Sequence, residues 1–262
     1  MPWRPRAWHR ACTTFTMRLL PGFDLVGGPV VAVVLGAASG LEAARPLRPR
    51  RCDRRSRWRT NASFGALAAA IVRVAVVPAM VRCAREVAAR NGGLLRRLPL
   101  PGAVRVIAGV LALDYTMYLW HRALHGAPLL WRFHATHHAD RDLDATTALR
   151  FHAGELAASL PFRCLQVAAL GVSPRLVLTY EVAMQTAAVL HHSNTRLPWR
   201  LEQALGLVFV TPRMHGIHHS TDARELASNW SVIFSFWDRL HGTHSLHEPQ
   251  PTIGLLPEND PR

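Results

Sequence analysis

The chain alternates long apolar runs with short polar segments that are rich in arginine. The longest apolar runs cover residues 25–44, 63–81, 103–120, 155–171 and 175–190. A helix that crosses a bilayer needs about 17 to 25 mostly apolar residues, so the first three runs predict membrane-spanning helices and the last two are marginal in length. The pattern therefore predicts an all-α integral membrane protein built as a helical bundle.

The stretch from 155 to 190 is interrupted between Gly171 and Pro174, where glycine and proline predict a turn between two helices. Both halves of this hairpin are short for a full crossing, so they would tilt, thin the bilayer or lie partly in its interface. In each case the chain returns to the side of the membrane that it left. The segments before and after the hairpin are therefore expected to meet in one cap.

The net charge of +14 comes from arginine, because the sequence has no lysine. The densest basic block, RPLRPRRCDRRSRWR at 45–59, lies between the first two apolar runs. Basic loops stay in the cytoplasm, so we interpret this block as a plain cytoplasmic flank that also contacts anionic head groups. Nucleic-acid proteins carry such charge as a stripe on a soluble domain, so no nucleic-acid partner is expected. The alanine- and arginine-rich composition is typical of a GC-rich bacterial genome, which indicates a multi-pass protein of a bacterial inner membrane.

With this block in the cytoplasm, the third apolar run returns inward and delivers His121 to the cytoplasmic face. One loop contradicts the charge rule, because this topology places it outside although it is basic. A shallow hairpin that never fully crosses would remove the conflict. The loop carries Arg82, Arg85, Arg90, Arg96 and Arg97.

Four parts of the chain follow from these patterns. They are a basic N-terminal segment (1–24), N-terminal membrane helices with the arginine-rich loop (25–100), a catalytic domain (101–247) and a polar, proline-rich flexible tail (248–262). The first apolar run lacks a small-residue cleavage site, which favours an uncleaved membrane helix over a secretory signal. The dispersed cysteines predict neither disulfides nor a thiolate metal site.

Histidines gather in three clusters, HRALH, HATHH and HGIHH. On a helix, spacings of three and four place side chains on one face, so each cluster can aim several imidazoles at one point. Neutral imidazole is a common ligand of zinc, copper, iron and nickel, and eight exceed what one tetrahedral ion needs. The clusters therefore predict two metal ions, held by His121, His125, His134, His137, His138, His215, His218 and His219.

Other histidines lie close to these clusters in sequence. His192 is the first candidate for a further ligand, ahead of His152 and His191. His241 and the two histidines that follow it are expected to be exposed or to support the ligands, and His9 is unrelated.

Acidic residues near the clusters could orient the ligands, because a metal-bound imidazole usually donates its other N–H to a carboxylate or carbonyl. Asp114 is two helical turns before His121 on the same face, in an apolar run where an ionisable residue tends to be functional. We assign Asp114 and Glu155 to the catalytic set in this supporting sense. Further candidates are Asp142, Asp144, Asp222 and Asp238.

The motifs together resemble the fatty acid hydroxylase superfamily, and within it the sterol desaturase family. The resemblance runs from 114 to 243 through DYTMYLWHRALHGAPLLWRFHATHH, DATTALRFHAGE, HHSN, TPRMHGIHHS and FWDRLHGT. It implies a non-haem di-iron centre on the cytoplasmic side of a helical membrane domain. Matched residue by residue, it implies the eight clustered histidines as ligands, with His192 added. His152-Ala153 replaces the usual His-Pro, and His241 replaces a usual Phe, which leaves the subfamily open.

The resemblance implies a dioxygen-dependent hydroxylase or desaturase that oxidises an unactivated C–H bond of a fatty acyl, sterol or carotenoid-type lipid. Its cofactors would be two iron ions, with dioxygen as cosubstrate. No flavin, nicotinamide or haem motif is present, so electrons would come from a separate reductase or ferredoxin-like protein. The alternatives are a non-redox zinc-binding membrane protein, either a hydrolase or a metal transporter, and a membrane cytochrome.

Overall fold

The computed structural model describes residues 6–248 and 250–256, with side chains from residue 24 onward. Within these residues it is all-helical, with only isolated β-bridges outside the helices. The long elements are α1 (Arg6–Ala44), α2 (Arg54–Ile71), α3 (Val77–Ala89), α5 (Gly102–Gly126), α6 (Pro128–His138), α7 (Ala153–Leu170) and α8 (Pro174–His192). The short ones are η1 (Val72–Val76), α4 (Leu94–Arg97), η2 (Ala145–Leu149), α9 (Trp199–Leu205), α10 (Pro212–His218), α11 (Ala223–Leu226) and α12 (Phe236–Leu240).

Three helical stretches are long and apolar enough to cross a membrane: Asp24–Ala44, Arg54–Arg97 and Gly102–Gly126. They correspond to the first three apolar runs, so the prediction of a helical membrane bundle is confirmed. The hairpin of α7 and α8 also forms as predicted, with Gly171 ending α7 at a left-handed φ of 71° and the Ser173 side chain capping α8.

The second membrane helix is longer than predicted. The chain runs through α2, a π-helical turn (η1) and α3 without a break, so Arg82 and Arg85 lie in a helix and not in a loop. The helix ends only where Asn91 and Gly93 adopt positive φ angles of 46° and 86°. The helical backbone also continues across the boundary expected after residue 24.

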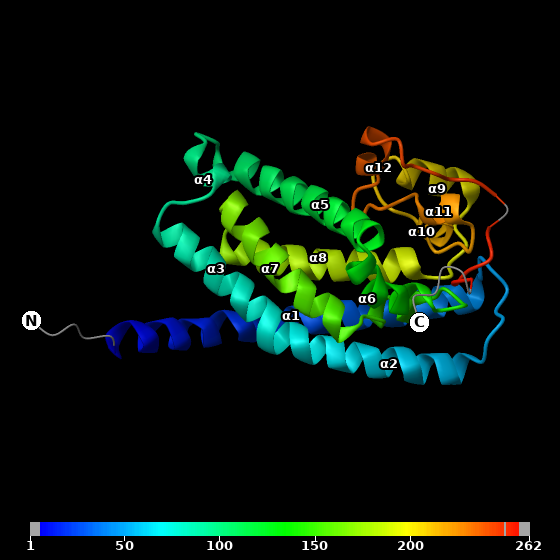
Figure 1. The fold of residues 1–262 in the computed structure, drawn as a ribbon, viewed down its shortest axis with the longest axis horizontal. Helices are drawn as coiled ribbons and strands as arrows, with labels where there is room; N and C mark the ends of the chain where they lie inside the picture. The colour runs from blue at the N-terminus through cyan, green and yellow to red at the C-terminus, as the bar shows by residue number, and fades with distance from the viewer. Residues whose placement is uncertain (1–5, 249, 257–262) are drawn as a thin grey trace, which may run out of the picture.

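The two ends of the bundle differ in what they carry (Figure 1). The short α4 and the turn between α7 and α8 lie at one end, and α6 and α9 to α12 lie at the other. The link between α1 and α2, which belongs to the arginine block, lies at this second end. The fold therefore places the arginine block and the histidine clusters at the same end, as the proposed topology requires.

The apolar core lies between α3, α5, α7 and α8. It is centred on fully or nearly fully buried side chains that include Met80, Leu113, Val167, Val177 and Tyr180. This core sets the register of α5 and α8, which carry histidines at their ends nearest the short helices.

Two expectations about polar segments are wrong. Arg48 and Arg57 of the arginine block are both only 8% exposed, so the block is more than a plain basic flank. The tail is not loose as far as residue 256, because its backbone pairs with the end of the third histidine cluster. Gly254 N–H donates to the His219 carbonyl over 3.1 Å, and Thr221 N–H donates to the Thr252 carbonyl over 2.9 Å.

Candidate metal centre

Nine histidines converge into two adjacent groups in which the possible ligand atoms all lie within 4.8 Å of one another. The five-histidine group contains His121, His125, His134, His138 and His218. The four-histidine group contains His137, His192, His215 and His219. These are the nine residues that the sequence assigned to metal ligation, and the structure brings all of them together.

The adjacent histidines of each doublet divide between the groups because of helix geometry. An α-helix turns by about 100° per residue, so neighbours point apart while residues four apart share a face. In α6, His134 and His138 join the five-histidine group and His137 joins the other. At α10, the pair four apart, His215 and His219, joins the four-histidine group. Each HxxHH motif therefore supplies both groups.

Four imidazoles are oriented by hydrogen bonds from Nδ1. His121 donates to the Trp230 carbonyl over 2.8 Å, and His218 donates to the Ser228 carbonyl over 2.8 Å. His134 donates to the Glu155 carboxylate over 3.1 Å, and His192 donates to the Ala188 carbonyl over 2.6 Å. Because these acceptors fix the proton on Nδ1, each Nε2 is left as a bare lone pair that can bind metal.

The bare nitrogens face one another. His121 Nε2 and His218 Nε2 are 3.1 Å apart, although neither carries a proton to share. Two such lone pairs repel unless a cation lies between them. Two nitrogens that each bind one ion at about 2.0 to 2.1 Å must lie within about 4.2 Å of one another, as these two do.

The Nε2 atoms of the four-histidine group are also close to one another. Nε2 of His192 is 2.9 Å from Nε2 of His137 and 2.9 Å from that of His215, which is 3.1 Å from Nε2 of His219. Several further buried ring nitrogens have no hydrogen-bond partner, among them His125 Nε2, His134 Nε2 and both nitrogens of His138. Unpartnered buried nitrogens at these positions fit bound metal, because buried polar groups otherwise find partners.

Burial keeps these imidazoles neutral. It lowers the pKa of His138, His215 and His219 well below the usual 6.5, and neighbouring histidines lower it further. Burial lowers the pKa of His192 to about 4, although the hydrogen bond to Ala188 favours its charged form. Neutral imidazole is the form that binds metal, so at neutral pH the groups need not lose protons to bind it.

Aromatic rings cover the five-histidine group. The Trp230 indole lies edge-on to His121, His125 and His218, with ring centroids 4.5 to 5.6 Å apart. Trp131 lies 4.7 Å from the His125 ring. Both tryptophans therefore lie directly against the histidines.

The loop that follows HATHH is held by a buried ion-pair network. Arg57 of α2 binds Asp140 through two nitrogens over 2.7 and 2.8 Å and binds Asp144 over 2.6 Å. Asn61 donates to Asp140 over 3.1 Å. Because this loop leads directly from α6, Arg57 helps to fix His137 and His138. Sequence reasoning missed this role, since 83 residues separate Arg57 from Asp140.

The two acids assigned to the catalytic set lie in different surroundings. Glu155 contacts His134, as described above. Asp114 is fully buried and accepts hydrogen bonds from Tyr180, from Trp237 and from the backbone of the 233–234 segment, over 2.9 to 3.3 Å. None of these donors is a histidine. Asp114 therefore anchors the segment that leads to α12, and its place in the catalytic set stays a prediction.

The remaining candidate acids hold loops and helix ends. Asp142 accepts from backbone N–H groups at 51 and 52, Asp144 caps η2, and Asp222 caps α11. Asp238 accepts from the backbone N–H of Trp230 over 2.8 Å. It thereby positions the Trp230 carbonyl, which accepts the hydrogen bond from His121 Nδ1.

The candidate histidines His152, His191 and His241 lie outside the two groups. His152 caps α7 by accepting from Gly154 N–H over 2.9 Å. His191 is buried and packs on His215 with ring centroids 4.1 Å apart. His241 stacks on Tyr118 and lies 3.1 Å from the Tyr115 hydroxyl. The side chain of His9 lies outside the described residues.

Known proteins share this part of the chain. The fatty acid hydroxylase family model matches residues 106–243. An alkylglycerol monooxygenase from Caenorhabditis elegans is 30% identical over 148 residues, which are 55% of this chain and 28% of that protein. The ornithine lipid hydroxylase OlsE from Rhizobium tropici is 31% identical over 157 residues, 59% of this chain and 46% of that protein.

Cholesterol 25-hydroxylase from Homo sapiens is 28% identical over 136 residues, which are 51% of this chain and 48% of that protein. The chain thus spans less than half the length of these three relatives. No solved structure matches it.

Proposed function

Because the chain belongs to the fatty acid hydroxylase family, we propose that it is a membrane-bound di-iron enzyme that uses dioxygen to hydroxylate a lipid. The observation that carries this proposal is the pair of histidine groups, whose Nε2 atoms face one another at 2.9 to 3.1 Å. Nine imidazoles suit two transition-metal ions. Iron bound there would supply the redox chemistry that dioxygen reduction and C–H oxidation need, which zinc lacks.

The protein's own part is to hold and orient the ligands. The carbonyls of Trp230, Ser228 and Ala188 and the Glu155 carboxylate keep four imidazoles in the metal-binding tautomer. Burial excludes water from the histidines, which are all 8% exposed or less apart from His125. A site that is oriented and dry needs little rearrangement when the reaction begins.

A lipid substrate follows from the position of the site. The histidines lie at one end of helices that are long and apolar enough to span a membrane, so a lipid can approach within the bilayer. The similar proteins are an alkylglycerol monooxygenase, an ornithine lipid hydroxylase and a cholesterol 25-hydroxylase. These names favour hydroxylation over desaturation for this chain as well.

We also propose that electrons come from a separate reductase or ferredoxin-like protein and that the histidine end faces the cytoplasm of a bacterial inner membrane. The orientation is supported by the arginine block at that end, under the positive-inside tendency. It can be tested with single cysteines at the exposed positions Arg55 and Arg90 in a cysteine-free variant. An impermeant thiol reagent on intact cells should label R90C and spare R55C, and the reverse labelling would contradict the orientation.

The activity is tested by expression in a bacterial host that supplies electrons and membrane lipids, grown under heavy-isotope dioxygen. Lipid mass spectrometry should reveal a product with one heavy oxygen atom that is absent with His218→Ala. A product that lacks two hydrogens and carries no label would show desaturation instead. No dioxygen-dependent product from any lipid class, with iron bound, would contradict the proposal.

A further inference from the structure

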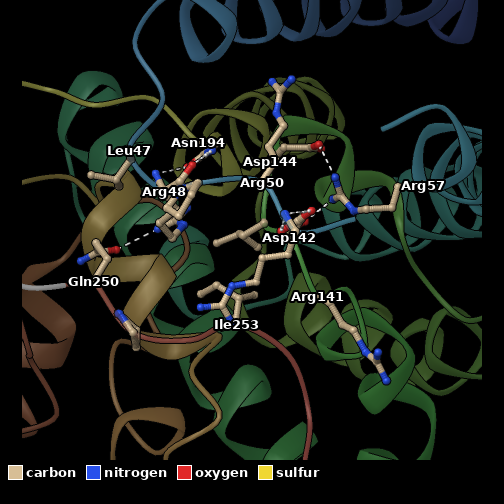
Figure 2. Close-up of a pocket in the computed structure, with 14 residues that line it drawn as sticks. Leu47, Arg48, Arg50, Arg57, Arg141, Asp142, Asp144, Asn194, Gln250 and Ile253 are labelled. Atoms are coloured by element: carbon tan, nitrogen blue, oxygen red, sulfur yellow. Dashed lines mark hydrogen bonds and ion pairs between the residues drawn. The ribbon is translucent and has the colours of Figure 1, made fainter. Parts of the chain in front are cut away.

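A basic pocket of about 290 Å³ is lined by the residues drawn in Figure 2, none of which is a histidine. Its walls come from the link between α1 and α2, from the loop after α6, and from the tail. A water molecule in the liquid takes about 30 Å³, so the pocket has room for a larger group. Five arginines line it against two aspartates: Arg48, Arg50, Arg51, Arg57, Arg141, Asp142 and Asp144.

Arg48 forms the buried floor of this pocket. Its Nη1 donates to Gln250 over 2.8 Å, but Nε and Nη2 are buried without a partner. Asn194 fixes the Arg48 backbone on both sides, since its Oδ1 accepts from Arg48 N–H and its Nδ2 donates to the Arg48 carbonyl, each over 2.9 Å. The guanidinium is therefore held in place while two of its donor atoms are unused. Unused donors of a buried guanidinium are costly unless an acceptor binds them.

The acids near Arg48 already have partners. Glu202 pairs with Arg213 over 2.7 Å, and Glu42 accepts from the backbone N–H groups of Ala145 and Asn194 over 3.0 to 3.1 Å. Asp142 accepts from the backbone N–H groups of Arg51 and Cys52 over 2.7 to 3.0 Å, and Asp144 binds Arg57. Burial lowers the pKa of Arg48 to about 10, which leaves the group charged at neutral pH. The five arginines of the lining outnumber its two aspartates, and three of them, Arg50, Arg51 and Arg141, form an exposed rim.

From this arrangement we propose that the pocket binds a phosphate-type oxyanion through Arg48, provided either by a phospholipid head group or by free phosphate. Guanidinium donors match phosphate oxygens in geometry and make strong charge-assisted hydrogen bonds. Residues of the pocket follow Ala44, where one candidate membrane helix ends, and precede Arg54, where the next begins. The pocket therefore lies close to the expected membrane boundary, where the phosphates of lipid head groups are located.

The anion site borders the metal centre without sharing a ligand. A Cβ on Gly216, between His215 and His218 of α10, would clash with Arg48 Nη1. Arg48 therefore packs directly on the helix that carries the third histidine cluster.

The test is thermal unfolding of the purified full chain in detergent, titrated with inorganic phosphate against chloride at matched ionic strength. A ligand of the folded state raises the unfolding midpoint in a saturable way. Phosphate should do so for the wild type and for the control Arg55→Gln, which changes an exposed arginine outside the pocket. In Arg48→Gln the half-saturating concentration should rise about tenfold or more. Phosphate on the metal ions would survive this substitution and is thereby distinguished.

If Arg48→Gln does not fold, the double variant R50Q/R51Q at the exposed rim is tested in the same way. A smaller increase of the half-saturating phosphate concentration is expected for it. A second arm reconstitutes each protein in phosphatidylglycerol nanodiscs and counts retained phospholipid by native mass spectrometry. One lipid retained by the wild type and lost in the variants identifies a head group, and phosphate saturation without retained lipid identifies free phosphate. Equal behaviour of wild type and pocket variants in both arms would overturn the proposal.

Discussion

The two histidine groups differ in how the surrounding protein orients them. Three of the five histidines in one group are fixed through Nδ1 by partners outside the group, two carbonyls and a carboxylate. In the four-histidine group only His192 has such a partner, and Nδ1 of the other three has none. The five-histidine group is thus oriented mainly by surrounding backbone and side-chain acceptors. The four-histidine group is oriented mainly by contacts among its own imidazoles. We expect the five-histidine group to hold its metal more firmly.

The largest expected effect comes from removing one ligand of each group. His218→Ala and His137→Ala should each lower product formation by about a thousandfold or more, because a bound metal supplies several kcal/mol of the catalytic effect. Lipid product per mole of protein measures this, with His247→Ala as a control at a partly exposed histidine outside the groups. Substantial activity in either variant would remove that residue from the ligand set.

A smaller effect is expected from the carboxylate that supports only one group. Glu155→Gln replaces the acceptor of the His134 proton and should weaken metal binding or activity about 10- to 100-fold. Competition with a chelator measures the loss, which should affect the metal of the five-histidine group alone. Glu225→Gln, which alters a carboxylate paired with His247, is the matched control. Equal loss of both metals would erase the distinction between the groups.

The stability of the metal-free protein should fall as the solution becomes more acidic. His192, His215 and His219 have pKa values below 6.5 in the folded state, about 4 for His192, so the unfolded chain binds more protons below pH 6.5. Stability is therefore full above that pH and is lost between about 6.5 and 4, by about 1.4 kcal/mol for each such histidine at one unit below 6.5. Thermal unfolding at about pH 7.5 and 5.5 measures this. An unchanged midpoint would show that the histidines are not buried in the metal-free protein.

The smallest expected effect is indirect. Asp238→Asn weakens the hydrogen bond to Trp230 N–H, and through it the position of the carbonyl that holds His121. Activity should fall a few-fold, less than in Glu155→Gln, because the carbonyl itself remains. Steady-state product formation by the two variants tests this order. A larger loss in Asp238→Asn would show that the five-histidine group depends more on the 230–238 segment than on Glu155.

The sequence was sufficient for the long helices and for the nine converging histidines, because apolar length and helical spacing are local properties. The division of each histidine doublet between two groups also follows from helix geometry, because adjacent residues of a helix point in different directions. The roles of Arg48 and Arg57 could not be predicted in this way. Their partners lie 83 to 202 residues away, and an arginine block beside a membrane helix looks the same whether its side chains are exposed or buried.

Asp114 illustrates a second limit of sequence reasoning. Its spacing from His121 was correct for one helix face, yet its carboxylate turns to Tyr180 and to the 233–237 segment. The position of a residue on a helix face predicts the direction of its side chain. It does not predict the hydrogen-bond partner, which depends on the segments that pack against that face. The outer partners of His121 and His218 are backbone carbonyls, which no residue type reveals.

The decisive measurement is the metal content of the protein, purified without oxygen after growth with ample iron. We expect about two irons per chain in the wild type, one of them lost more readily to a chelator. We also expect His137→Ala to lose this labile iron first and His218→Ala to affect the other. Stoichiometric zinc in place of iron, a haem absorption band, or a single iron shared by all nine histidines would contradict it.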